Sequence, residues 1–215
     1  MDHDGFTVVY SDAAMLVLDK QAGLLSVPGR GEDKQDCLSS RVQRRFTDAL
    51  VVHRLDMATS GLMVMARGVG SQRILNHAFA QRAVKKRYVA IVDGQLRSSS
   101  ETWGVVDLPI VVDWPNRPRR VIDPQLGKPS VTRWRILSHI PSDQTTRVEL
   151  EPITGRSHQL RIHMLALGHP IVGDELYGSP RVQALATRLL LHACSLELQH
   201  PVTNQPMRFL SPPQF

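Results

Sequence analysis

Short apolar segments, separated by turns rich in glycine, proline and polar residues, are the feature that most limits what this chain can fold into. Their length and alternation are typical of half-buried β-strands. Strands outnumber helices and most connections are short turns, so we predict an α+β fold around a mixed, mostly antiparallel sheet flanked by helices and loops. The predicted strands include residues 6–12, 14–20, 62–66, 88–94, 131–137 and 146–152.

A few segments have helical spacing instead. Residues 37–50 predict an amphipathic helix with an arginine face, residues 69–82 a second helix, and residues 158–167 a third that Gly168 ends. Ser179 followed by Pro180 is a typical helix start. Lys20 and the residues after it are expected in a loop. Residues 97–120 are expected to form an irregular, ordered excursion from the sheet that exposes three arginines, Arg117, Arg119 and Arg120.

Composition narrows the class of partner. Lys and Arg outnumber Asp and Glu by 26 to 20, and the pI near 9.8 favours a polyanion such as nucleic acid. The hydrophobic share of 42% is enough for a core. The two cysteines, Cys37 and Cys194, and the lack of a signal peptide predict a reduced, cytoplasmic protein. The apolar runs are too short to cross a membrane.

Common cofactor motifs are missing from the sequence. No paired cysteines or HExxH point to a metal, and His158 and His163 would lie about 140° apart around a helix. Since there is also no P-loop and no dinucleotide fingerprint, we expect neither a metal nor another cofactor. The chemistry must then come from side chains, and the segment HRLDMATSG at 53–61 places a carboxylate, Asp56, on a loop between two strands. Taken alone, this segment is better explained by a structural salt bridge than by catalysis.

Four segments, in order, resemble the RluA family of pseudouridine synthases. HRLDMATSGL at 53–62 resembles the family's catalytic motif, and KKRYVA at 85–90 resembles its tyrosine motif. PITGRSHQLRIHMLALGHPIVGDELYG at 152–178 resembles its long C-terminal block, and RLLLHA at 188–193 is the fourth match. The resemblance covers nearly the whole chain and is strongest to a dual-specificity member. Since HRLD arrives by residue 53, we expect one catalytic domain, 1–215, without an N-terminal S4-type RNA-binding domain.

The resemblance implies roles for individual residues. Asp56 would act on a flipped uridine, by attack on C1′ of the ribose or through a glycal-like intermediate. Arg156 would pair with the Asp56 carboxylate, and Tyr88 would stack on uracil and help to remove the C5 proton. We assign base flipping to Arg54, because a guanidinium can fill the vacated stack. Leu189 or Leu190 would line the uracil pocket, or belong to the core.

The implied substrates are 23S ribosomal RNA and the anticodon stem-loop of transfer RNA, bound by a monomer. A small basic protein can recognise the shape of such loops. A non-catalytic RNA-binding module is the alternative, and a glycoside hydrolase using Glu151 or Asp174 as second carboxylate is a remote one. The expected RNA-backbone contacts are basic residues: Arg41, Arg44, Lys85, Lys86, Arg117, Arg119 and Arg120.

Overall fold

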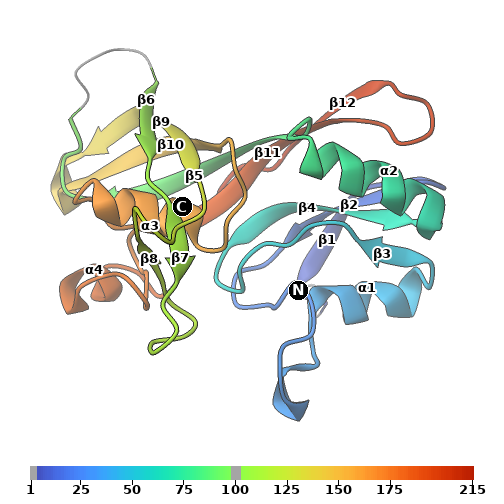
Figure 1. The fold of residues 1–215 in the computed structure, drawn as a ribbon, viewed down its shortest axis with the longest axis horizontal. Coiled ribbons are helices and arrows are strands. Elements are labelled where there is room, and N and C mark those ends of the chain that lie inside the picture. Colours follow the sequence, from blue (N-terminus) through green and yellow to red (C-terminus); the bar gives the residue numbers. More distant parts are fainter. Residues whose placement is uncertain (1–3, 98–102) are drawn as a thin grey trace. The chain divides into compact units, whose positions relative to one another are not determined.

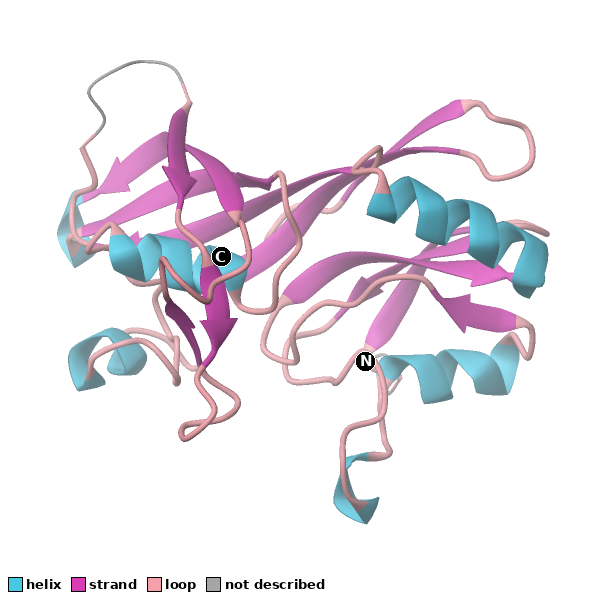
Figure 2. Ribbon diagram, viewed as in Figure 1, coloured by secondary structure: helices cyan, strands magenta, loops and turns pink. Residues whose placement is uncertain are grey.

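The structure, a computed structural model, describes residues 4–97 and 103–215. Part of the irregular segment predicted at 97–120 therefore lies outside the described residues. The chain forms two compact units, Met1–Lys86 with His192–Gln214, and Arg87–Leu191 with Phe215. Both are built from strands with a few helices (Figures 1 and 2), which confirms the predicted α+β class.

The first unit is organised around β4. This strand pairs antiparallel with β2 along its length and with β3 near its end, and it pairs parallel with β11 at its start. Strands β1 and β12 extend the sheet by pairing antiparallel with β2 and β11. The elements are β1 (Phe6–Ser11), β2 (Met15–Lys20), the 3-10 helix η1 (Glu32–Lys34), α1 (Leu38–Arg45), β3 (Ala49–Val51), β4 (Ser60–Arg67), α2 (Gly68–Ala80), most of β11 (Leu191–Gln199) and β12 (Pro206–Leu210).

The core of this unit lies between the sheet and α2. Helix α2 packs on β3 and β4, and α1 packs on β3. Gly61 permits the close parallel pairing of β4 and β11, because a Cβ there would lie 2.4 Å from the Ala193 carbonyl oxygen. The buried side chains of the core come mainly from the strands and from α2: Met15, Val17, Leu62, Val64, Ala66, Leu75, Val84, Leu196, Leu198 and Phe209.

The second unit is a purely antiparallel sheet with strand order β5-β10-β9-β6, and a separate β7–β8 hairpin. Helix α3 packs on β8, β9 and β10 and buries Leu160 and Met164. The elements are most of β5 (Lys85–Asp93), β6 (Gly104–Asp107), β7 (Ile110–Val112), β8 (Arg120–Ile122), β9 (Val131–Ile140), the 3-10 helix η2 (Pro141–Asp143), β10 (Thr145–Pro152), α3 (Gln159–Ala166) and α4 (Pro180–Ala184).

Several local predictions were wrong. The helix predicted at 37–50 ends at Arg45, because Phe46 leaves helical geometry and residues 49–51 pair with β4 as β3. Lys20, predicted both as the end of a strand and as the start of a loop, is the last, fully buried residue of β2 and not a loop residue. The segment predicted to be irregular, 97–120, contains β6, β7 and the first residue of β8. The expected stops and starts at Gly168 and Ser179 are confirmed, and the Ser179 side chain accepts a hydrogen bond from the Val182 N–H.

Candidate active site

The loop that carries Asp56 joins β3 to β4 and is fixed on both sides of this residue. The Ser26 hydroxyl donates to the Leu55 carbonyl (2.7 Å) and accepts from the Leu55 N–H (3.1 Å). On the other side, the Met57 carbonyl accepts from the Gly23 N–H at 2.9 Å. The Asp56 carbonyl accepts from Thr59, which tightens the turn. Asp56 itself remains partly exposed, so a preorganised backbone presents an accessible carboxylate.

Lys20 is the second charged group at this loop. Its side chain has no exposed surface, and its ammonium donates to the carbonyls of Gln21 (2.8 Å), Leu24 (2.8 Å) and Met57 (3.1 Å). Burial lowers the pKa of Lys20 to about 8, although the nearby carboxylates of Asp56 and Asp19 favour its charged form.

The Lys20 ammonium thus joins the Asp56 loop to the end of β2. Sequence reasoning missed this residue, because nothing in a strand-then-loop pattern marks a buried lysine.

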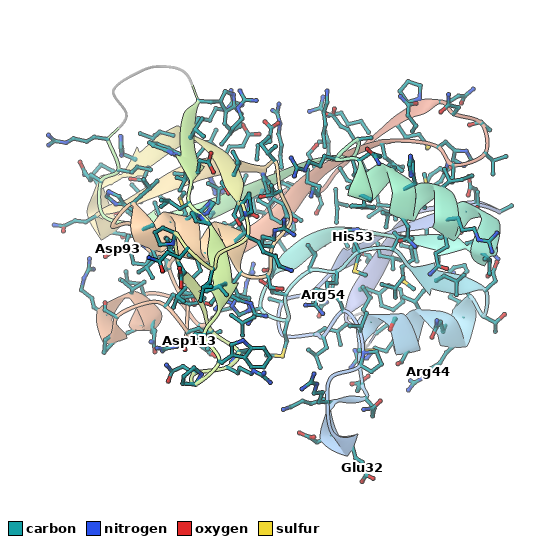
Figure 3. The ribbon with its side chains drawn as sticks, in the orientation of Figure 1. Glu32, Arg44, His53, Arg54, Asp93 and Asp113 are labelled. Atoms are coloured by element: carbon teal, nitrogen blue, oxygen red, sulfur yellow. The ribbon has the colours of Figure 1, made fainter. Side chains whose placement is uncertain are left out.

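The residues before Asp56 alternate between inside and outside, as predicted. Leu55 is buried, and His53 stacks on Phe79 with ring centroids 4.4 Å apart. The His53 Nε2 accepts the Val64 N–H at 3.0 Å. Burial, with the nearby charge of Lys86, lowers the pKa of His53 to about 3, so this ring is neutral. Between them lies Arg54, labelled in Figure 3, which is exposed on the same loop as Asp56.

The TGR turn in the second unit is held by a glutamine. The Gln159 side-chain oxygen accepts from the Thr154 hydroxyl (2.7 Å) and from the Arg156 N–H (3.0 Å), and its amide donates to the Val131 carbonyl. The Arg156 guanidinium is exposed, with its Nε 3.4 Å from the Pro129 carbonyl. The turn therefore fixes the backbone of Arg156 while leaving its side chain accessible.

The other predicted active-site residues of this unit lie on or beside β5. Tyr88 is half-buried and pairs with Leu150 of β10. Leu189 is a core residue with 2% of its surface exposed, whereas Leu190 is partly exposed. The Leu190 backbone bonds to Val172 and to Ile91 of β5. Of the two leucines, only Leu190 has accessible surface to offer a ligand.

The predicted RNA-contact residues differ in their surroundings. Arg41 is engaged, since its guanidinium forms two bonds with Asp36, at 2.6 and 2.7 Å, and a third with the Asp4 carbonyl. Lys86 is half-buried, with its ammonium 6.0 Å from the Phe79 ring centre. Arg44 and Lys85 are exposed. Arg117 and Arg119 are exposed in the β7–β8 hairpin, as predicted, whereas Arg120, also predicted to be exposed, is half-buried as the first residue of β8.

Several histidines make hydrogen bonds with other groups of the protein. His192, expected to be a packed residue, is buried and contacts the hydroxyls of Ser60 (2.9 Å) and Ser211 (3.0 Å). His163 is buried against Thr132 and the Leu108 carbonyl. Within residues 4–97 and 103–215, no cluster of three or more His, Cys, Asp or Glu side chains is suited to a metal ion. In the same residues, no helix is long and apolar enough to span a membrane.

Comparison with known proteins places this chain in a family. The model of the RNA pseudouridylate synthase family matches residues 14–166, which include Asp56, Tyr88 and Arg156. The chain belongs to this family. The chain is 49% identical, over 97% of its length and 93% of the relative, to the dual-specificity RNA pseudouridine synthase RluA of Escherichia coli strain K12. It is 46% identical over 94% of its length to the RluA of Haemophilus influenzae.

Solved structures of pseudouridylate synthases share the fold. Human RNA pseudouridylate synthase domain containing 1 superposes with a TM-score of 0.78 at 28% identity, covering 97% of this chain and 84% of that one. Human RNA pseudouridylate synthase domain containing 4 gives a TM-score of 0.76 at 26% identity, covering 96% and 88%. The chain is therefore an RNA pseudouridine synthase, an isomerase, as the sequence motifs predicted.

Proposed function

We propose that this synthase isomerises specific uridines in both 23S ribosomal RNA and the anticodon stem-loop of transfer RNA, with Asp56 as its catalytic residue. The observation that carries the proposal is the 49% identity with a dual-specificity enzyme across 97% of the chain. The HRLDMATSGL segment and the rigid loop that presents the Asp56 carboxylate support the assignment of this residue.

The proposed reaction balances without a co-reactant. The N1–C1′ bond of the uridine breaks, the uracil rotates, and a C5–C1′ bond forms while the C5 proton leaves and N1 regains a proton. A carboxylate suits the first step in either of two ways, as a nucleophile at C1′ or as the group that promotes a glycal-like intermediate. Because the product is an isomer of the substrate, the proposal requires neither a cofactor nor a metal.

Three other residues complete the proposed machinery. The Arg156 guanidinium binds the Asp56 carboxylate in its ionised form, which a low-dielectric site would otherwise disfavour. Tyr88 stacks on the uracil and assists proton removal at C5. Arg54, exposed on the Asp56 loop, fills the space left by the flipped nucleotide. These roles come from the matching family motifs, and each predicts a distinct defect on substitution. Loss of Arg156 or Tyr88 should impair the chemical step, and loss of Arg54 should impair extrusion of the base.

The deciding experiment measures pseudouridine in an anticodon stem-loop transcript and in a 23S fragment. Asp56→Asn keeps the size of the side chain but removes the carboxylate, so we expect product to fall below detection on both RNAs while RNA binding persists. Asp143→Asn is the matched control, because Asp143 is an exposed aspartate in η2, and it should react like the wild type.

Product from wild type on one RNA alone would refute dual specificity. Salt-sensitive binding of both RNAs without product from wild type would favour the non-catalytic binding module.

We also propose that the protein acts as a cytoplasmic monomer composed of one catalytic domain. Sedimentation at assay concentration tests the monomer, which a dimer-sized species would contradict.

A further inference from the structure

The β7–β8 hairpin carries a tip whose side chains are exposed although its backbone is well ordered. Residues 114–119 are all exposed. The Asp113 N–H donates to the Arg119 carbonyl, and the Arg119 N–H donates to the Asn116 carbonyl, at 3.1 and 3.0 Å. The Asn116 amide donates to the Asp113 carboxylate at 3.0 Å. Asp113 is labelled at this hairpin in Figure 3. The tip is therefore a projection whose backbone is held by its own hydrogen bonds and whose side chains are largely exposed to solvent.

The base of the hairpin is fixed to the segment that carries Arg156. The Tyr177 hydroxyl accepts the Arg120 N–H at 2.9 Å and contacts the His158 Nδ1 at 2.6 Å. His158 directly precedes α3 and lies two residues after Arg156.

Tyr177 is itself held by buried charges. The guanidinium of Arg161 lies 4.9 Å from the centre of the Tyr177 ring and forms a bidentate ion pair with Asp174, at 2.6 and 2.7 Å. The hairpin is thus attached to the segment that follows the turn of Arg156, the residue to which we assign a catalytic role, and both lie in the second unit.

An exposed tryptophan dominates the tip. Trp114 has 66% of its surface exposed, and the Arg117 guanidinium carbon lies 3.4 Å from the centre of its ring. Indole rings are usually covered in soluble proteins, so a rigid loop that presents one to solvent indicates a partner. A flat ring braced by a guanidinium is suited to stacking with another flat ring, and nucleobases stack on such platforms.

The charge around Trp114 specifies the partner further. None of the ion pairs within residues 4–97 and 103–215 involves Arg117, Arg119 or Arg120. Segment 113–120 contains one acidic residue, Asp113. Three guanidiniums in such a short segment favour phosphates. An apolar protein surface would leave the exposed guanidiniums of Arg117 and Arg119 without ionic partners. The Arg120 guanidinium also donates to the carbonyls of Pro118 and Arg119, both at 3.1 Å.

We propose that the hairpin tip is a stacking platform for an unpaired base of the substrate RNA loop, with Trp114 under the base and Arg117, Arg119 and Arg120 on the neighbouring phosphates. The inference rests on the proposed RNA substrates and deepens them, because it assigns recognition to a residue outside the catalytic motifs. The platform holds the loop and takes no part in the chemistry. Its loss therefore weakens substrate capture and leaves turnover of bound RNA intact.

Steady-state kinetics on the anticodon stem-loop test whether the platform contributes to substrate binding and not to turnover. Trp114→Ala should raise KM about tenfold, the effect of losing one stacked base, while kcat stays within about twofold of wild type. Trp114→Phe retains an aromatic face and should restore most of the affinity. Arg208→Ala, which removes one exposed arginine from β12, is the charge control and should leave KM unchanged.

Fluorescence gives a direct readout of the contact. The chain has three tryptophans, of which Trp134 is 8% exposed and Trp103 is intermediate, so quenching by acrylamide reports mainly on Trp114. RNA binding should protect wild-type fluorescence from acrylamide. The protection should be absent in Trp114→Phe even though this variant binds RNA.

The two proposals fail in different ways. No pseudouridine from wild type would refute the proposed function. An active wild type whose KM is unchanged in Trp114→Ala, or whose Trp114 remains equally quenched with RNA bound, would overturn the platform. Self-association that Trp114→Ala abolishes, with KM unchanged, would assign the tip to contacts between copies of the chain instead.

Discussion

The sequence identified Asp56 as the candidate catalytic residue, but it did not identify the residues that hold its loop. The HRLD segment places a carboxylate between two predicted strands, and the match of this segment and three others to the family's motifs singles out Asp56. Lys20 and Ser26 have no such signal. They act through carbonyls at Leu24, Leu55 and Met57, and only the folded chain brings these groups together. Gln21 and Leu24 are near Lys20 in the sequence, but the Met57 carbonyl is 37 residues away, and only the fold brings it to the buried ammonium.

The buried ammonium of Lys20 predicts a rise in stability at alkaline pH. Its pKa of about 8 in the folded protein lies below the ordinary value of 10.5, so the folded state binds fewer protons between these two values. The free energy of unfolding should therefore rise as the pH increases through this window. Relative to Lys20→Met, which cannot titrate, the wild type should gain about 2 kcal/mol between pH 8 and pH 10.

Urea unfolding of both proteins across that range provides the measurement. Comparison with Lys20→Met cancels the contributions of the other lysines and tyrosines. Parallel curves for the two proteins would mean that Lys20 has the same pKa folded and unfolded.

At the scale of elements, long periodic segments were predicted well and short pairings were not. Helix α2 and strands β2, β4 and β5 lie close to their predicted positions because their apolar patterns are strong. Strand β12 was not predicted, since a five-residue segment with one buried side chain is stabilised by pairing with β11. The same holds for β7 and β8, which have three residues each and lie in a proline- and arginine-rich segment. Strand pairing is a non-local interaction, and local propensity does not reveal it.

His53 joins three elements and predicts sensitivity to acid. It connects the Asp56 loop to β4 through the Val64 N–H and to α2 through Phe79. The bond from Val64 requires the neutral ring, because the His53 Nε2 must offer a lone pair. Because its folded pKa of about 3 lies below the ordinary 6.5, the unfolded state binds more protons between these values, and stability falls as the pH decreases through them. Between pH 6.5 and pH 5 this residue should remove up to about 2 kcal/mol.

His53→Gln is the matched variant, since its amide oxygen can accept the Val64 N–H without titrating. Its urea midpoint should be less dependent on pH between 6.5 and 5 than that of the wild type. An equally steep decline in both proteins would assign the acid sensitivity to other groups.

At the scale of the whole molecule, the excess of basic residues predicts RNA binding that weakens with salt. The formal net charge is +6, and each phosphate that the protein neutralises adds about one unit to the slope of log affinity against log salt. Net charge alone does not identify the contacts. Substitutions of Arg41 and Arg44 can distinguish the effect of net charge from the effect of direct phosphate contacts. Both residues lie on α1, and each substitution by alanine removes one positive charge.

Their surroundings differ, and this difference makes the test sharp. Arg41 is already bonded to Asp36 and to the Asp4 carbonyl, so binding a phosphate would require it to exchange partners, whereas Arg44 is exposed (Figure 3). We expect Arg44→Ala to reduce the slope by about one unit and Arg41→Ala by less than half of that. Titration of a fluorescent stem-loop at several salt concentrations measures both slopes. Equal reductions would show that the overall field of the protein, and not contacts from individual arginines of α1, determines the affinity for RNA.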